Sequence, residues 1–433
     1  MVLTAHFIDD DWVLHKRILN FVVIPNHKGK TIRQLVESCL IGWGIEKVFT
    51  IVVDNASPNK VGLDYMRDKI GNWKELVLNG AFLHMRCCCH ILNLIVKDGM
   101  EELGSLIDAI GEVELYFMLD IAVKYRKAFM RLEDEDIQFE SYFQEKIGGK
   151  KMCGPPNSAD WDKVVRLVKF LLKIFHDATI QNSGSKVVTD QPLLWMCTIV
   201  GELDKCIKSG DPLMASIGIA MKEKFDKYWG RLEDMNKICL IVVLMDPRYK
   251  VLYLEYFFPK LQEYKAKVQQ MVTEVKKIFE KMYKEYYDAD PEAAQASMEA
   301  ILPKVDGAPA LSVDEDSHAA NISAFMKLRE EQHVVEIKSE VDKYLLEALE
   351  DPTKKNFGIL GWWKENAPRY PILSQIAKDV FPVPASTVAS KSAFSLGKRV
   401  IDPFRASLTP RMVECLVYCS DWLRGNSSAA LYK

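Results

Sequence analysis

Residues 48–53, Val-Phe-Thr-Ile-Val-Val, are the feature that most constrains the fold of this chain. The run is apolar without the alternation of a half-exposed strand, and Asp54 follows it directly. Such a run is typical of a strand that is covered on both faces, as in a sheet with helices on each side. A carboxylate that follows a buried strand lies where α/β sheets place their ligands. The sequence therefore predicts a helix-covered sheet with Asp54 at its functional edge.

The residues before this strand predict a hairpin and a helix. Residues 2–9 and 13–23 are β-rich runs joined by the acidic turn 9–11, which we expect to be a solvated turn and not a cation site. Thr31 and Gln34 form a capping-box pattern at the start of an apolar stripe that ends at Trp43. A hairpin, a helix and a buried strand indicate a mixed α+β fold.

The rest of the chain is predicted to be mostly helical. Apolar residues recur at helical spacing in the middle and near the end of the chain, over residues 90–103, 159–176, 214–229, 321–350 and 372–380. Residues 238–245 are a short apolar run that fits either a strand or a buried helix, whereas residues 289–320 have the composition of a mobile linker. A last helix is capped by Thr409 and begins with Pro410.

Composition limits the class of protein. The formal net charge of −3 over 433 residues gives no global basic field for nucleic acid, so DNA contact would need a local patch. The ten cysteines include no C-x2-C pair, which argues against a zinc finger or a disulfide framework and favours a reducing compartment. No apolar run approaches the length of a membrane span, and the N-terminus does not have the pattern of a secretion signal. The cytosol or the nucleus is therefore expected.

Four segments carry a family resemblance. Residues 48–59, 82–99, 359–380 and 386–423 resemble the hAT transposase superfamily, and most closely its plant ricesleeper and daysleeper group, whose members carry a BED zinc finger. The resemblance implies a truncated RNase H-like α/β core, interrupted by a mostly helical insertion and followed by a helical dimerisation region. The implied divisions are an N-terminal core part without its first strand, the insertion, a flexible linker, and the dimerisation region that completes the core: residues 1–110, 111–288, 289–320 and 321–433.

The resemblance also implies a catalytic set of two Asp and one Glu that holds two metal ions for phosphoryl transfer. The second acid falls on Asp54 and the Glu falls on Lys391, while the first acid belongs to a strand that would precede Met1. A lysine ammonium has no lone pair for a hard cation and repels it. The chain is therefore expected to be no enzyme and to hold no metal or cofactor. Lys391 is expected to pair with Asp54 instead.

Other residues take roles from the same resemblance. Cys87 and His90 match a family Cys-x2-His motif, for which we expect packing and hydrogen bonding rather than half a zinc site. Trp362 and Trp363 are expected to pack in a core or a subunit interface rather than to stack on bases. The residues expected at the dimer interface or in the core are Trp362, Trp363, Phe394, Phe404, Leu408, Met412, Val413, Leu416 and Trp422. The candidate DNA contacts are Lys398, Arg399, Arg405 and Arg411.

These expectations define a nuclear interaction protein, a domesticated hAT derivative that forms a homodimer or pairs with a related hAT-derived protein. The chain holds no match to the BED finger, so DNA binding is expected to be weak, and no membrane contact is expected. The alternative functions are a residual sequence-independent DNA-binding protein, a non-functional transposase fragment, or an active nuclease with a rebuilt site. The alternative location is the cytoplasm.

Overall fold

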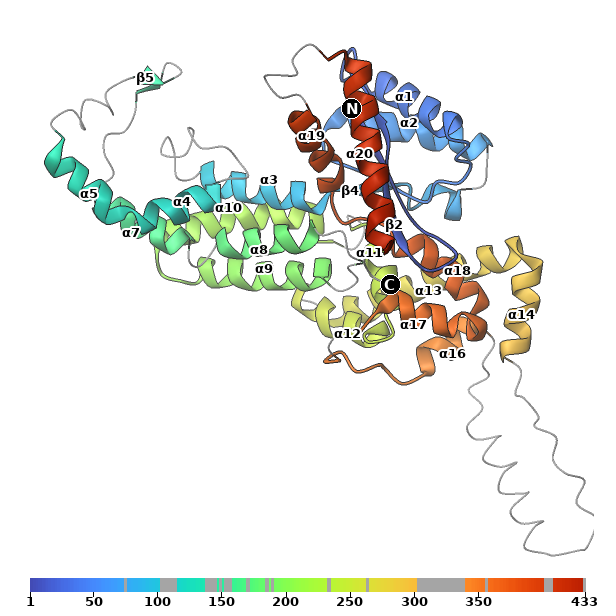
Figure 1. Cartoon of the computed structure of the whole chain (residues 1–433). Helices are drawn as coiled ribbons and strands as arrows, with labels where there is room; N and C mark the ends of the chain where they lie inside the picture. The colour runs from blue at the N-terminus through green and yellow to red at the C-terminus, as the bar shows by residue number, and fades with distance from the viewer. Residues whose placement is uncertain are drawn as a thin grey trace, which may run out of the picture.

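A computed structural model describes most of the chain. The described residues are 1–73, 76–101, 115–136, 146–147, 150–151, 158–168, 172–183, 187, 191–231, 235–261, 265–301, 339–354, 357–400 and 408–430. Helices dominate, and a small sheet region lies where the N-terminal and C-terminal parts of the chain meet (Figure 1). The structure is of mixed α+β class, as predicted.

The N-terminal hairpin is confirmed. Strand β1 (Val2–Ile8) pairs antiparallel with β2 (Leu14–Phe21), and the register shifts between Leu3 and Thr4. The acidic turn is closed by the backbone N–H of Asp9, which donates to the carbonyl of Val13 at 3.1 Å. The turn is therefore a structural connection between the two strands.

The buried strand is shorter than predicted. Only Ile51–Val53 forms β3, which pairs in parallel with β4 (His84–Arg86). All three β3 residues are half-buried, so the prediction that residues 48–53 are covered on both faces is wrong. The physical reason is that no ladder joins β3 to β1, and a cavity lies along that side of the strand.

Two helices cover this N-terminal unit. Helix α1 (Gly29–Gly42) packs on α2 (Ser57–Trp73) through a small core that contains Val36, Leu63 and Met66. The helix predicted from residue 31 begins at Gly29. Its capping box does not form, because the Thr31 hydroxyl donates to the Asn26 side chain at 2.8 Å.

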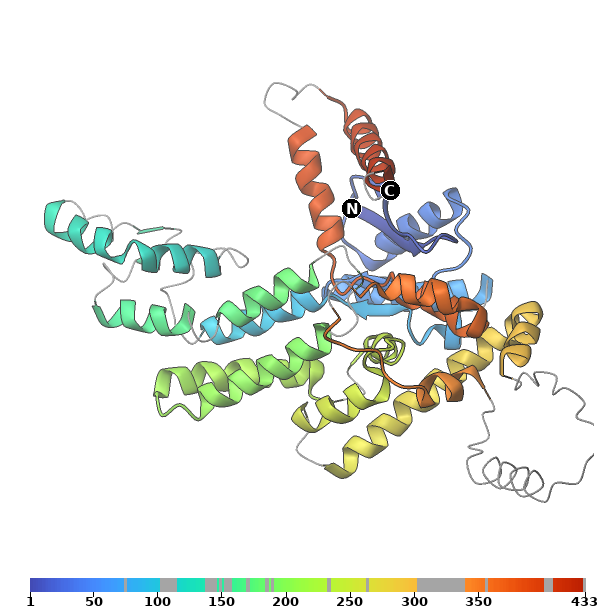
Figure 2. The same ribbon diagram turned by 60° about the horizontal axis from the view of Figure 1, so that its bottom comes forward.

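A helical arm extends to one side of the sheet region (Figures 1 and 2). Its inner part consists of α3 (Cys88–Glu101), α8 (Lys173–Asn182), α9 (Gln191–Ile207) and α10 (Pro212–Trp229). Its outer part consists of α4 (Leu115–Lys124), α5 (Arg126–Glu135) and α7 (Ser158–Leu167), with the short strands β5 (Lys146–Ile147) and β6 (Lys150–Lys151). The helix predicted over 159–176 is described as α7 and α8, and residues 169–171 between them lie outside the described residues. Helix α7 packs on α4, whereas α8 packs on α3 and α9.

The structure at the centre of the molecule shows what residues 238–245 form, and it differs from the linker predicted over residues 289–320. The apolar run at 238–245 is a buried helix, α11 (Ile238–Leu244), followed by α12 (Lys250–Leu261) and α13 (Lys265–Ala289). The linker predicted from residue 289 is wrong for its first part, which is α14 (Pro291–Ile301) packed against α13 and α18. Its Ala-rich sequence favours a helix as much as a linker. Residues 302–338 lie outside the described residues.

The described part of the C-terminal region contains five α-helices. They are α16 (Glu340–Leu346), α17 (Ile359–Asn366), α18 (Pro371–Val380), α19 (Val388–Val400) and α20 (Pro410–Ala430). The helix predicted over 321–350 ends at Leu346, and its part before 339 lies outside the described residues. The last helix begins as predicted, with the Thr409 hydroxyl accepting from the Met412 N–H at 3.3 Å.

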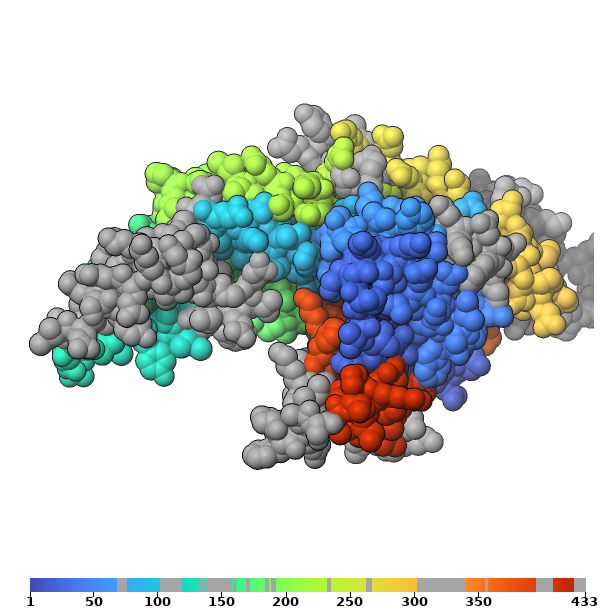
Figure 3. Space-filling model, turned by 90° about the horizontal axis from the view of Figure 1, so that it is seen from above, coloured from blue at the N-terminus to red at the C-terminus, as the bar shows by residue number. Residues whose placement is uncertain are grey.

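Helix α20 closes the outer edge of the hairpin. The Ile18 N–H donates to the Asp421 carboxylate at 2.8 Å, and the Phe21 N–H donates to the Tyr418 hydroxyl at 2.9 Å. Figure 3 shows the red atoms of the C-terminal helices lying against the blue N-terminal residues. Side chains thus satisfy main-chain groups that an open strand edge would leave free. No helix in the described part of the chain has both the length and the apolar character of a membrane span.

Candidate functional site

The candidate active-site edge begins at Asp54, directly after β3. The Val53 carbonyl accepts from the Cys87 N–H at 2.9 Å, which places Asp54 beside the start of α3. The Asp54 carboxylate accepts from the Ala56 N–H at 3.0 Å and from the Asn59 side-chain amide at 2.6 Å. Asp54 therefore lies at the strand end, as predicted, and orders the first turn of α2.

Cys87 connects this edge to the C-terminal region. Its buried sulfur accepts from the His90 N–H at 3.4 Å, and from the backbone N–H and the hydroxyl of Thr387 at 3.3 and 3.4 Å. The Cys88 N–H donates to the Ala385 carbonyl at 2.9 Å. The packing and hydrogen-bonding role predicted for this motif agrees with these contacts. Sequence reasoning missed the partner segment, because 300 residues separate Thr387 from Cys87.

Lys391 reaches the same neighbourhood through this connection. Its N–H donates to the Thr387 carbonyl at 3.2 Å in the first turn of α19, and its side chain is exposed. Burial raises the pKa of the Cys89 thiol, against smaller lowering effects that include the Lys391 ammonium. Lys391 thus lies near the start of α3. The predicted ion pair between Asp54 and Lys391 is not formed. Both residues are described, and the Asp54 carboxylate accepts from Ala56 and Asn59 instead.

Metal-ligating side chains are not clustered around Asp54 in the described part of the chain. Within the described ranges, no group of three or more His, Cys, Asp or Glu side chains lies close enough to hold a metal ion. By resemblance, Asp54 falls on one acid of the family set, and Lys391 stands at the Glu position with an ammonium that cannot ligate a cation.

The residues expected at the dimer interface or in the core differ in how far they are buried. Trp363 is fully buried, with its indole N–H donating to the Met245 carbonyl at 3.0 Å, and Val413 is buried against Ile18. Trp362 and Leu408 are half-buried, and Phe404 lies outside the described residues. The exposed members are Phe394, Met412, Leu416 and Trp422. Both tryptophans therefore pack in the hydrophobic core, as expected, and Trp363 is the more deeply buried of the two.

Helix α20 has two apolar faces. Val413 and Val417 face the hairpin, with exposed fractions of 5% and 0%. Met412, Leu416 and Leu423 are exposed by 54%, 40% and 68%. Together with the exposed Cys419, the residues 412, 416, 419 and 423 have the spacing of one helical stripe. We name this set the outer stripe, and it contains Met412 and Leu416 from the residues expected at the interface or in the core.

Trp422 belongs to a different contact. Its ring stacks on Trp43 with centroids 5.6 Å apart and an interplanar angle of 4°, and the Arg17 guanidinium lies 5.5 Å from the ring centroid. Its indole N–H donates to the Ile18 carbonyl at 3.4 Å. Trp422 therefore fastens α20 to the hairpin and to α1. Its prediction as interface or core is resolved toward intramolecular packing.

Of the four candidate DNA contacts, the structure describes the side chain of Arg411 only. Arg411 is exposed in the first turn of α20. Lys398 and Arg399 lie on α19, but their side chains are outside the described set, as is all of Arg405. Their role in DNA binding stays a prediction.

Comparison with known proteins identifies the class. A model of the hAT family C-terminal dimerisation region matches residues 340–423. A model of the hAT-like transposase RNase-H fold matches residues 193–286, the range of α9 to α13, and a model of the ZBED1 RNase-like domain matches residues 1–82.

Full-length similarity gives the same class. The chain is 31% identical to a putative AC transposase of Zea mays over 100% of its own length and 56% of that relative. It is 29% identical to the zinc finger BED domain-containing protein RICESLEEPER 2 of Oryza sativa subsp. japonica, with 98% and 62% covered, and 26% identical to DAYSLEEPER of Arabidopsis thaliana, with 99% and 62% covered. The chain thus spans a little over half the length of these relatives.

The chain is therefore related to hAT transposases through the family's RNase-H fold and C-terminal dimerisation region. Its relatives include the ricesleeper and daysleeper proteins as well as the maize transposase.

Proposed function

We propose that this chain works as a catalytically inactive hAT derivative that self-associates through the outer stripe of α20. The two apolar faces of α20 carry the proposal. The inner face is used by the hairpin, while the outer stripe exposes Met412, Leu416 and Leu423 within the range that matches the family dimerisation region. Apolar stripes of this kind are typical of helix partners in obligate interfaces.

A second copy of this chain, or a related hAT-derived protein with a similar stripe, is the partner that fits. Single exposed apolar residues are ordinary on a protein surface, but a continuous helical stripe favours association. Cys419 is exposed in the outer stripe, so a disulfide between two copies can trap the dimer. In a symmetric dimer a residue close to the two-fold axis faces its own copy, so Cys419 on the stripe can report the contact directly.

Solution mass tests self-association. We expect light scattering behind a sizing column to give twice 49.5 kDa for the wild-type chain and 49.5 kDa for Leu416→Asp. Leu252→Asp is the matched control, because Leu252 on α12 is exposed by 59% and lies outside the stripe. A wild-type monomer would overturn the proposal. An Leu416→Asp dimer would show that another surface associates.

The proposed inactivity rests on the residues at the Asp54 edge. One carboxylate and one ammonium cannot balance the charge of two divalent ions. We expect no nicking of supercoiled plasmid with Mg²⁺ or Mn²⁺, because the ammonium of Lys391 stands at the position of the family Glu and repels a divalent cation. Metal-dependent nicking that disappears in Asp54→Asn would contradict this, since a contaminating nuclease would survive that substitution.

We further propose a nuclear location and weak DNA binding, because relatives named as transposases and as zinc finger BED domain proteins match along the chain. A fluorescent fusion in plant cells tests the location. Fluorescence anisotropy with duplex DNA tests the binding, for which we expect an affinity that falls steeply with salt. An affinity independent of salt would argue against phosphate contacts, and a cytoplasmic fusion would overturn the location.

A further inference from the structure

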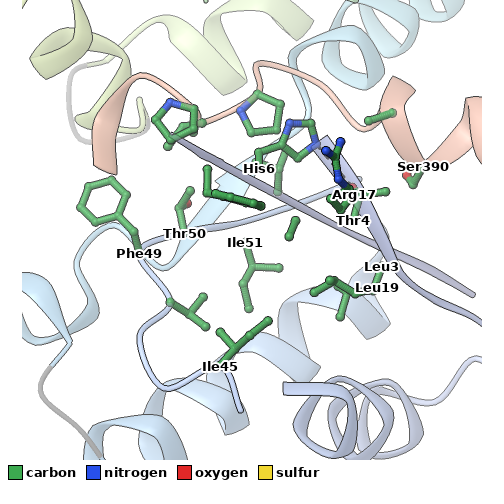
Figure 4. A pocket seen from close by; sticks show the side chains of 18 of the residues that line it. Leu3, Thr4, His6, Arg17, Leu19, Ile45, Phe49, Thr50, Ile51 and Ser390 are labelled. Atoms are coloured by element: carbon green, nitrogen blue, oxygen red, sulfur yellow. Dashed lines mark hydrogen bonds between the residues drawn. The ribbon is translucent and has the colours of Figure 1, made fainter. Parts of the chain in front are cut away.

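Cavities of about 480 Å³ lie beside β3 and beside β4. The cavity beside β3 separates this strand from the hairpin, and Figure 4 shows His6 on one side of it and Thr50 on the other. It belongs to the sheet region of the core itself. The second space, which we name the β4 cavity, has cationic and sulfur-containing side chains in its lining. Its lining residues include Arg67, His84, Met85, Arg86, Met196 and Met235.

The β4 cavity lies at the edge of β4 that does not pair with β3. The Leu83 carbonyl accepts from β3, so the next carbonyl along the strand, that of His84, points the other way. It accepts from the Asn236 side-chain amide at 2.9 Å, and the Asn236 side-chain oxygen accepts from the Ile238 N–H at 2.9 Å. The segment before α11 is therefore held against β4. Helices α2, α3, α9, α10 and α13 contribute further walls.

Two arginine side chains line the β4 cavity from separate elements, Arg86 on β4 and Arg67 on α2. The Arg86 guanidinium lies 5.7 Å from the centre of the Tyr228 ring and has no carboxylate partner among the described residues. Arg67 has a long contact of 3.8 Å with the exposed Asp64. No Asp or Glu belongs to the described lining of the cavity. This wall therefore carries positive charge that its own lining does not balance.

His84 reports the sign of the electrostatic potential in the cavity. Its pKa is lowered first by burial and next by the charge of Arg86. Arg67 and Lys60 lower the pKa further, whereas Asp64 raises it. The Nε2 atoms of His84 and Nε of Arg67 are buried with no hydrogen-bond partner in the described part of the chain. An anion in the cavity would oppose this positive potential and would supply an acceptor.

The opposite part of the lining is apolar. Met85, Met196 and Met235 are buried there, together with Trp229 and Ile91. Methionine side chains adapt to the shape of a ligand, and an indole offers a flat apolar face. A volume of about 480 Å³ is in the range of small-molecule sites. The lining therefore fits a compact anionic group joined to a flat apolar body.

The positions of the cations favour phosphate over carboxylate as the anionic group. One guanidinium fork already engages both oxygens of a carboxylate. A phosphate monoester has three terminal oxygens, so it can accept from guanidinium groups that approach from two directions. Arg86 and Arg67 come from a strand and from a helix, which is the arrangement that a phosphate can use.

We propose that the β4 cavity binds a small aromatic phosphate monoester, with its phosphate at Arg86 and Arg67 and its ring on the methionine side. The β4 cavity is separate from the Asp54 carboxylate and from the outer stripe of α20, because neither Asp54 nor any residue of that stripe lines it. The proposal depends on neither self-association nor the loss of catalysis.

Isothermal titration calorimetry of the full chain with 1-naphthyl phosphate tests the proposal. We expect saturable binding. Three control compounds each lack one part of the ligand: 1-naphthol has no anion, 1-naphthoate has a carboxylate, and inorganic phosphate has no ring. Each control should bind at least tenfold more weakly. Equal binding of any control would overturn the proposal, and so would the absence of binding up to millimolar 1-naphthyl phosphate.

DNA carries the same anionic group, so a competition experiment distinguishes the two sources. A short duplex with a 5′-phosphate should not displace 1-naphthyl phosphate, because a cavity of this volume holds a small molecule. Displacement by that duplex but not by the same duplex without its 5′-phosphate would identify a DNA end as the occupant. The proposal of a small-molecule site would then be wrong.

Methyl NMR of the wild-type chain locates the ligand without any substitution. With saturating 1-naphthyl phosphate, the methyl signals of Met196 and Met235 should shift. The signal of Met298 should stay in place, since Met298 is 59% exposed on α14 and does not line the cavity. Shifts confined to methionines outside the β4 cavity would refute the site.

Substitution of Arg86 gives a further readout. Arg86→Gln should weaken binding at least tenfold, and Arg86→Lys should weaken it less, because lysine keeps the charge but loses the fork. Lys205→Gln is the matched control, since it also removes one positive charge, at a side chain 73% exposed on α9 outside the cavity. Binding of Arg86→Gln equal to that of Lys205→Gln would overturn the proposal. If Arg86→Gln does not fold, the methyl shifts of the wild-type chain decide.

Discussion

Replacing Cys87 by alanine should loosen the contact that holds the C-terminal region to the sheet edge. The substitution removes one sulfur that accepts three hydrogen bonds, from the His90 N–H and from the N–H and hydroxyl of Thr387. The Cys87 side chain is 1% exposed, so water cannot readily replace these bonds.

The magnitude follows from the three lost bonds. The His90 bond caps the first turn of α3, and loss of such a cap costs about 1 kcal/mol. The Thr387 N–H becomes a buried unsatisfied donor, which costs about 1 kcal/mol at the low end appropriate to a weak sulfur acceptor, while the hydroxyl can rotate. The free energy of unfolding should therefore fall by about 2–3 kcal/mol. Cys87→Ser keeps an acceptor and should cost less than about 1 kcal/mol.

Urea denaturation measures these differences, provided that circular dichroism and tryptophan fluorescence give coincident transitions. Cys197→Ala is the matched control, since Cys197 is also buried but makes a single long contact to the Phe257 carbonyl at 3.8 Å. A Cys87→Ala loss no greater than the control loss would refute the reasoning. A wild-type midpoint that falls when EDTA is added would favour a metal role for the motif instead.

Three further predictions concern stability, each measured as a shift of the urea midpoint. His6 has its pKa lowered to about 4 by burial, so the folded state prefers the neutral ring and stability is lost as pH falls from 7.5; the loss by pH 5 should be up to about 2 kcal/mol, and His6→Gln should abolish that pH dependence. Trp363→Phe leaves the Met245 carbonyl without its donor and should cost about 2–4 kcal/mol, so a loss under about 1 kcal/mol would contradict its central place. Glu340→Ala leaves two buried amides at the start of α18 unsatisfied, at a cost of about 2–4 kcal/mol, and a neutral effect would show that water serves them.

Local patterns in the sequence predicted the local parts of the fold. The hairpin, the start of α20 at Pro410 and the place of Asp54 after β3 all depend on residues close together in the chain. Composition misled at α14, because alanine, glutamate and serine occur in both linkers and helices, and only the contacts with α13 and α18 decide between them.

The candidate site depended on contacts that no local pattern contains. The link from Cys87 to Thr387 spans 300 positions, and it fixes where α19 and Lys391 lie. The ion pair expected between Lys391 and Asp54 failed for a different and local reason, since the Asp54 carboxylate accepts from Ala56 and Asn59 instead. The expectation was based on charge alone, whereas the turn after β3 already provides the Asp54 carboxylate with two hydrogen-bond donors.

The hairpin decides which face of α20 is left for a partner. Its β2 edge is satisfied by Asp421 and Tyr418 of α20, so the inner face of the helix is already used within the chain. The outer stripe remains exposed. Leu416→Asp should therefore abolish self-association while changing the free energy of unfolding by no more than about 0.5 kcal/mol, as is usual for a surface substitution. A larger fall would mean that the dimer contact holds α20 against the hairpin, and that folding and association are one process.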